Sequence, residues 1–113
     1  MFKNRTKQLA LKVVEFVADL PRNKIADVLG TQILRSGTSV GANYRAACRA
    51  KSTADLISKL GIVEEEADET GYWLELLVES KAVLTSKAEW LLKESNELTA
   101  MTVASIKTLR ARR

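Results

Sequence analysis

Apolar residues recur with helical spacing through almost the whole sequence, and this periodicity limits the possible folds more than any other feature. Leu9, Val13, Phe16, Val17 and Leu20, for example, fall on one face of a helix. The 113 residues include only one Pro and five Gly, which are too few turn-forming residues for the many turns of a β-sandwich or a β-barrel. The pattern therefore predicts an all-α chain.

The periodic stretches predict four helices joined by short connections. Pro21 ends the first stretch, because proline prevents simple continuation of a helix. Short connections make successive helices antiparallel, so we expect an up-and-down antiparallel four-helix bundle that forms a single domain over residues 1–113. The predicted helices span residues 5–20, 25–49, 53–81 and 87–110.

The second predicted helix has a middle of small residues, which by composition alone would indicate a loop. We expect a helix there, because the apolar stripe stays in phase from Ile33 to Tyr44. Gly37 and Gly41 lie four residues apart and share a face of this helix. Small residues on that face would let another helix approach closely, or they would mark a kink.

The composition excludes several kinds of catalytic and metal site. There is no His, which rules out His-dependent acid–base catalysis, Ser-His-Asp triads and His-containing metal sites. No nucleophile–base pair or ligand set is visible, so we expect no enzyme and no cofactor. Cys48 is the only cysteine, and we expect it to be a small buried residue. No apolar run approaches a membrane span or a signal core, which predicts a cytoplasmic protein without a membrane partner.

A run of acids distinguishes the third predicted helix, where residues 64–79 hold seven acids and no base. A carboxylate metal site would need inward acids from several helices, and these acids crowd one helix. Clustered acids destabilise a helix unless cations face them, and arginine binds carboxylates bidentately. We therefore expect the second and third helices to face one another here. Arg35, Arg45 and Arg49 are the expected partners.

Cations gather near both ends of the sequence. Residues 1–50 carry nine Lys/Arg against three Asp/Glu, although the net charge of the whole chain is only +4. In an up-and-down bundle the start of the first helix and the end of the fourth lie at the same end, so these cations would converge. They would form either a solvated charged end or a phosphate-binding surface whose affinity falls with salt. The candidate nucleic-acid-binding residues are Lys3, Arg5, Lys7, Lys12, Lys107, Arg110, Arg112 and Arg113.

Two adjacent aromatic residues, Tyr72 and Trp73, lie in the third predicted helix. Adjacent positions point about 100° apart on a helix, so both side chains cannot fully face one bundle core. One of the two is therefore a candidate for a subunit interface, where Tyr and Trp are enriched. Stacking on unpaired bases is the alternative.

Two segments carry a resemblance to a known family: LGTQILRSGTSVGANYR at residues 29–45 and KLGIVEEEADETGYWLELL at residues 59–77. They resemble the four-helix bundle protein family, also called the large-subunit (23S) ribosomal RNA intervening-sequence protein family. That family is related to the accessory variability determinant of diversity-generating retroelements. The resemblance implies a bundle that assembles into a homopentameric ring and has no established enzymatic activity. With the charge argument above, it predicts a structural polar network of Arg35, Asn43, Arg45, Glu65, Glu66 and Glu69.

Two functional hypotheses follow from these features. The basic residues and the resemblance favour a non-enzymatic oligomer that binds RNA or DNA through basic surfaces. The acid-rich third helix and the modest net charge favour a scaffold or accessory subunit that binds another protein and no nucleic acid. In both cases we expect a homo-oligomer, and the resemblance implies a pentamer.

Overall fold

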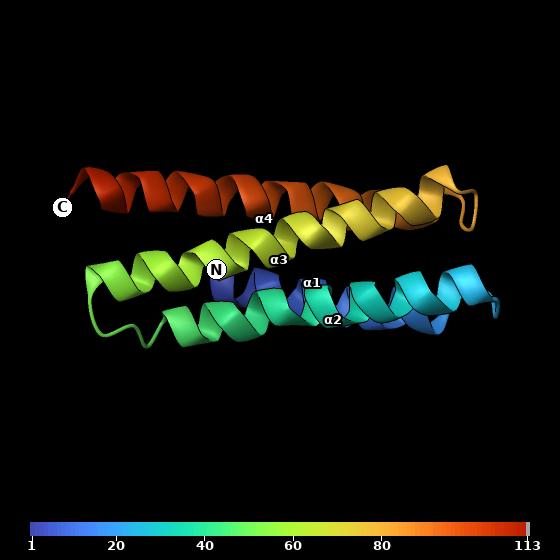
Figure 1. Ribbon diagram of the computed structural model, residues 1–113, viewed down its shortest axis with the longest axis horizontal. Helices are drawn as coiled ribbons and strands as arrows, with labels where there is room; N and C mark the ends of the chain where they lie inside the picture. Colours follow the sequence, from blue (N-terminus) through green and yellow to red (C-terminus); the bar gives the residue numbers. More distant parts are fainter. Residues whose placement is uncertain (113) are drawn as a thin grey trace.

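The computed structural model describes residues 1–112, and four helices account for nearly all of them (Figure 1). Successive helices run antiparallel, and the bundle measures 48 × 22 × 20 Å. The predicted all-α, up-and-down four-helix bundle is confirmed, and residues 1–112 contain no strand. The helices are α1 (Phe2–Ala18), α2 (Lys24–Ala47), α3 (Thr53–Glu79) and α4 (Thr85–Ala111).

The helices begin and end within a few residues of the predicted positions. Asn23 and Ser52 cap α2 and α3, because their side-chain oxygens accept hydrogen bonds from the backbone nitrogens of Ala26 (2.9 Å) and Asp55 (3.1 Å). The helices differ in length: α1 has 17 residues, whereas α4 has 27. As a result, α4 extends well past the start of α1 (Figure 1).

The small residues of α2 serve to bring α1 close. A Cβ atom added at Gly37 would lie 2.7 Å from Val13 Cγ2, and one added at Gly41 would lie 3.3 Å from the backbone oxygen of Thr6. α2 continues through both positions without a break. The expectation that small residues here let another helix approach closely is confirmed, and α1 is that helix.

Two groups of buried side chains form the core. The larger group draws on all four helices and includes Val13, Ile33, Leu74 and Leu98. The smaller group lies near the α2–α3 connection and contains no residue of α1. At this end α2 and α4 therefore have no fourth helix beside them. The smaller group consists of Ala47, Ile57, Leu60 and Ile106.

Candidate nucleic-acid interface

The end of the bundle that contains the α2–α3 connection is rich in cations and poor in acids. Residues 28–54 and 98–112 contain no Asp or Glu, and Asp55 is the one acid among residues 53–63. Figure 1 shows that the α2–α3 connection and the C-terminal part of α4 lie at the same end. We call this region the basic end, and its cations are Arg45, Arg49, Lys51, Lys59, Lys107, Arg110 and Arg112.

Asp55 is already bound to its own neighbours within the basic end. Its carboxylate accepts hydrogen bonds from Lys59 Nζ (2.7 Å) and from the backbone nitrogen of Lys51 (3.0 Å). These bonds, that of Lys59 first, hold the pKa of the Asp55 carboxyl below its usual range. The six cations other than Lys59 are exposed, and within residues 1–112 none of them forms an ion pair. Their charge is therefore available to an anionic partner.

Arg5, Lys7 and Lys12 of α1 do not join this region, so the predicted convergence of eight cations at one end is wrong. Arg5 donates to Glu94 on α4 through Nε (2.9 Å) and Nη2 (2.8 Å), and to Glu97 (3.0 Å). The bond to Glu94 is the main reason that the pKa of Arg5 is raised above its usual value. Because Arg5 meets α4 at Glu94 and Glu97, the start of α1 lies about 15 Å short of the end of α4 at a rise of 1.5 Å per residue.

Of the other predicted cations, some lie on α1 and some lie at the basic end. Lys3 and Lys7 are exposed on α1; Lys3 directly follows Phe2, whose ring meets that of Tyr44, and Lys7 lies about one turn further along α1. Lys12 Nζ lies 3.9 Å from Glu15 Oε2 on the same helix. Arg113 lies outside the described residues. The predicted cations that do belong to the basic end are Lys107, Arg110 and Arg112.

Sequence reasoning missed the cations that α2 and its connection contribute. Arg45, Arg49 and Lys51 lie more than 50 residues before Lys107, the first of the C-terminal cations of the basic end. They share an end with those cations because α2 and α4 point in the same direction in the bundle. The signal that could have found them is the absence of acids from two long stretches that both end at this place.

The predicted polar network is present only in part. Arg35 on α2 pairs with Glu66 and Glu69 on α3, and Arg35 Nη1 lies 3.3 Å from Glu66 Oε1. Trp73 Nε1 donates to Glu69 Oε1 at 3.2 Å, which extends the network along α3. Asn43 does not take part, because its amide donates to the Ser39 oxygen of its own helix at 2.8 Å. At the acidic run α2 and α3 do face one another.

The expected pairing of Arg45 and Arg49 with the acidic run is wrong. Both arginines and Glu65 are exposed, and neither arginine forms an ion pair in the part of the chain that the structure describes. The reason is the antiparallel alignment of the two helices. Arg35 lies level with Glu66, so residues further along α2 lie level with the start of α3, before the acids begin.

The adjacent aromatic residues divide between surface and core, as their spacing predicts. Tyr72 is 53% exposed, whereas Trp73 is half-buried and packs against the larger core group. Their ring centroids lie 5.1 Å apart in an edge-to-face arrangement. Tyr72 is therefore the member of the pair that a second molecule could contact.

A groove of about 270 Å³ opens between α2 and α4 where α1 is missing, and we call it the α2–α4 groove. The rings of Phe2 and Tyr44 meet at its edge, with centroids 4.5 Å apart. Cys48 also lines the groove and is exposed, so the expectation of a buried cysteine is wrong. It is exposed because no helix covers this face of α2. Burial raises the pKa of the Tyr44 hydroxyl, with a smaller contribution from Cys48.

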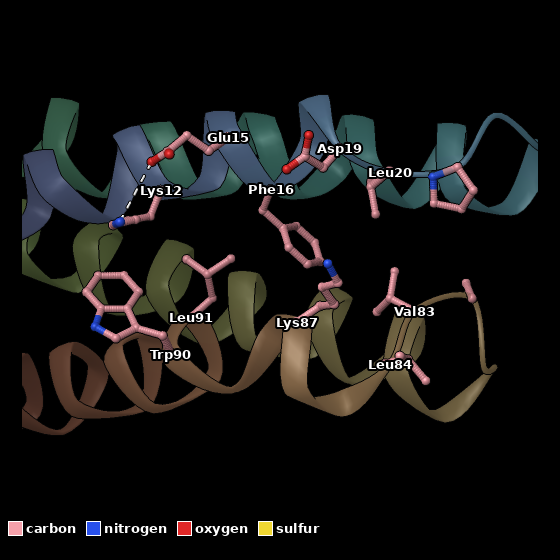
Figure 2. Close-up of a pocket in the computed structure, with 12 residues that line it drawn as sticks. Lys12, Glu15, Phe16, Asp19, Leu20, Val83, Leu84, Lys87, Trp90 and Leu91 are labelled. Atoms are coloured by element: carbon pink, nitrogen blue, oxygen red, sulfur yellow. Dashed lines mark ion pairs between the residues drawn. The ribbon is translucent and has the colours of Figure 1, made fainter.

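A second and larger hollow of about 580 Å³ lies between α1 and α4 at the opposite end of the bundle (Figure 2). We call it the α1–α4 cleft. These two helices contact one another less than the other neighbouring pairs do. Phe16 and Leu91 face each other across the cleft, and Trp90, 47% exposed, lies at its edge. The charged side chains of its rim are Lys12, Glu15, Asp19 and Lys87.

Metal and membrane sites find no support in residues 1–112. No three His, Cys, Asp or Glu residues among them are grouped so as to hold a metal ion. No helix among them is both long enough and apolar enough to cross a bilayer. Candidate surfaces for function include the basic end, the α2–α4 groove, the α1–α4 cleft and the exposed ring of Tyr72.

Comparison with known proteins gives a family and solved structures of the same fold. The model of the family described as "23S rRNA-intervening sequence protein" matches residues 2–104. A crystal structure of a protein with unknown function from the S23 ribosomal protein family of Bacteroides thetaiotaomicron is 37% identical and superposes with a TM-score of 0.85. The alignment covers 95% of this chain and 99% of that chain. No curated protein matches.

Proposed function

Because the chain belongs to the 23S rRNA-intervening sequence protein family, we propose that it is a non-enzymatic homo-oligomer that binds nucleic acid through the basic end. The observation that carries this proposal is the separation of charge. Seven cations and one acid lie at the basic end, although the net charge of the whole chain is only +4. The rest of the molecule is therefore slightly acidic, and a polyanion is attracted to one end. The family description names 23S rRNA, which is such a polyanion.

The exposure of these cations also supports phosphate binding. Lysine and arginine that neutralise phosphates release condensed counterions, so affinity falls as salt rises. Arg5 and Arg35 are unavailable for this role, because they bind glutamates on neighbouring helices. The six unpaired cations of the basic end have no such partner within residues 1–112, so no ion pair has to break before they bind.

Salt dependence gives the first test of this proposal. We expect the logarithm of the association constant for a fluorescein-labelled RNA to fall linearly with the logarithm of salt concentration, with a slope of about −3 to −5 for some four to six phosphate contacts. Fluorescence anisotropy measures the slope directly. Binding that is absent at low salt, with the protein verified as folded, would contradict the proposal.

The α1–α4 cleft favours a second function, contact with protein. Its apolar floor and its exposed Trp90 are features of protein interfaces, where aromatic residues are enriched. We propose that copies of this chain cover it in the homo-oligomer, for which the family resemblance implies a pentamer. Tyr72 on α3 is a second candidate contact. The alternative is a scaffold that binds a different protein there and no nucleic acid.

Charged substitutions in the cleft test this assembly. Replacing Leu84 and Trp90 with Lys should dissociate the oligomer, because two unpaired charges would be buried at the contact. Both side chains are largely exposed in the single chain, so the fold should survive. Ile25 and Val28, exposed on α2, replaced with Lys give a control with the same added charge. Light scattering at micromolar concentration distinguishes the outcomes.

A monomeric wild-type protein would contradict self-assembly. If the Ile25/Val28 variant dissociates while the cleft variant stays oligomeric, the subunit contact lies on α2 and not in the cleft. An intact oligomer that binds no RNA would favour the scaffold alternative over the nucleic-acid function.

A further inference from the structure

The α2–α4 groove lies within the basic end, next to the point where the ring of Phe2 meets that of Tyr44. It is lined by residues of α2, α3 and α4 and by Cys48. Tyr44 of α2 and Cys48, the residue that caps the end of this helix, line one side of the groove, and Ser105 of α4 also lines it. The groove continues along α4 past Ser105 into a shallower hollow that reaches Thr108 and Leu109.

The size of the groove limits what it can hold. Its volume of about 270 Å³ falls just below the range of roughly 300–1,000 Å³ that is usual for small-molecule sites. A volume of this size accommodates one flat ring system. The lining is mainly apolar, with aromatic rings at one edge. These are the properties of a surface on which a planar aromatic group stacks.

The charges around the groove select among planar ligands. Arg45 directly follows Tyr44 in α2, and Arg49 directly follows Cys48 just after the end of that helix, so both arginines adjoin residues that line the groove. On α4, Arg112 lies two helical turns beyond Ser105 on the same face. A flat group that carries negative charge on both sides of its ring complements this arrangement. A nucleotide within a strand has that form, since a phosphate precedes and follows each base.

We propose that the α2–α4 groove takes an unpaired nucleobase, so that the basic end selects single-stranded or unpaired nucleic acid over continuous duplex. This inference rests on the proposed nucleic-acid function and adds the class of nucleic acid. The base stacks against the rings of Tyr44 and Phe2, while Arg45, Arg49 and Arg112 hold the adjacent phosphates. Duplex bases are stacked on one another and cannot enter the groove, so duplex uses the cations alone.

Paired and unpaired forms of one sequence test the inference. The probes are a fluorescein-labelled RNA strand of about 12 nucleotides, the same strand annealed to its complement, and a DNA strand of the same sequence. We expect the wild-type protein to bind the single strand about 10-fold more tightly than the duplex at equal salt. The DNA strand shows whether the 2′-hydroxyl contributes.

Variants of the groove show whether stacking is responsible. Tyr44→Leu should weaken binding of the single strand about 10-fold and change duplex binding by less than about two-fold. Tyr44→Phe keeps the ring and should retain the wild-type affinity. Ser105→Leu fills the groove from an exposed position, so it should reproduce the effect of Tyr44→Leu even if that variant folds poorly.

Two outcomes would overturn the inference and leave the proposed function standing. One is equal affinity of the wild-type protein for strand and duplex. The other is an equal loss of strand and duplex binding in both Tyr44→Leu and Ser105→Leu. If neither strand nor duplex binds at low salt, the proposed nucleic-acid function fails together with the inference.

Discussion

Replacing Gly37 with Ala should lower the free energy of unfolding by about 1–3 kcal/mol, the usual range for adding a methyl group to a well-packed core. The added Cβ would lie 2.7 Å from Val13 Cγ2, 3.0 Å from Cγ1 and 3.2 Å from Cβ. Val13 is fully buried and β-branched, so its side chain has few rotamers into which it can move. The overlap between the added Cβ and Val13 can therefore be relieved only if α1 and α2 move apart. That movement weakens the contacts between the two helices.

Gly61 is the matched control for this substitution. It also lies inside a helix, but an added Cβ atom would meet nothing within 4 Å. Gly61→Ala should therefore stabilise the protein by up to about 1 kcal/mol, the difference in helix propensity. Urea unfolding followed by circular dichroism, at one protein concentration for all variants, measures both values. If Gly37→Ala is as stable as Gly61→Ala, α1 and α2 do not approach as closely as the structure shows.

The helices could be predicted from the sequence because each depends mainly on local information. Periodic apolar residues, a proline after the first helix and side-chain caps such as Asn23 act within one or two turns. Even the Gly/Ser-rich middle of α2 kept the apolar stripe in phase, and the structure shows an unbroken helix there. The helix that packs against this stretch of α2 could not be predicted. Gly37 indicates that another helix approaches closely there, but it does not indicate which helix.

The candidate site was harder to predict, because it depends on how far each helix is shifted along the bundle axis. Periodicity gives the face of a helix that is buried and contains no information about this axial shift. The prediction that the cations of α1 and α4 converge followed from the up-and-down topology alone, which places the start of the first helix and the end of the fourth at the same end of the bundle. In the structure Arg5 instead meets Glu94 and Glu97, well before the end of α4.

The same axial shift explains two other wrong expectations. Arg45 was expected to lie beside the acids of α3, but it lies level with the start of that helix, where Asp55 is the one acid before Glu64. Cys48 was expected to be buried, but the short α1 leaves its face of α2 uncovered. Both residues therefore belong to the surface that we propose for nucleic-acid binding.

Removing charge from the basic end should have the largest effect on binding. Replacing Arg45, Arg49, Lys107 and Arg110 with Gln should weaken the affinity for RNA on the order of 100-fold at about 0.1 M salt. The slope of log affinity against log salt should become shallower by about 3, because each lost phosphate contact contributes roughly 0.7–0.9. All four side chains are exposed and form no ion pair within residues 1–112, so the fold should be unaffected.

The matched control removes four cations that lie toward the opposite end, where the α1–α2 and α3–α4 connections are, and that line neither the basic end nor the α1–α4 cleft. Arg22, Lys24, Lys81 and Lys93 are also exposed, and their replacement with Gln changes the net charge by the same amount. It should leave the salt slope within about 0.5 of the wild-type value, because these residues contact no phosphate in our account. The control therefore separates a local binding surface from a general effect of net charge.

The most direct test of the account is the salt slope of RNA binding, measured by fluorescence anisotropy for the wild-type protein and the two four-fold variants. We predict that the basic-end variant has a shallower slope than the wild-type protein, whereas the control has the same slope as the wild-type protein. Equal slopes and equal affinities in the two variants would contradict the claim that the basic end binds nucleic acid.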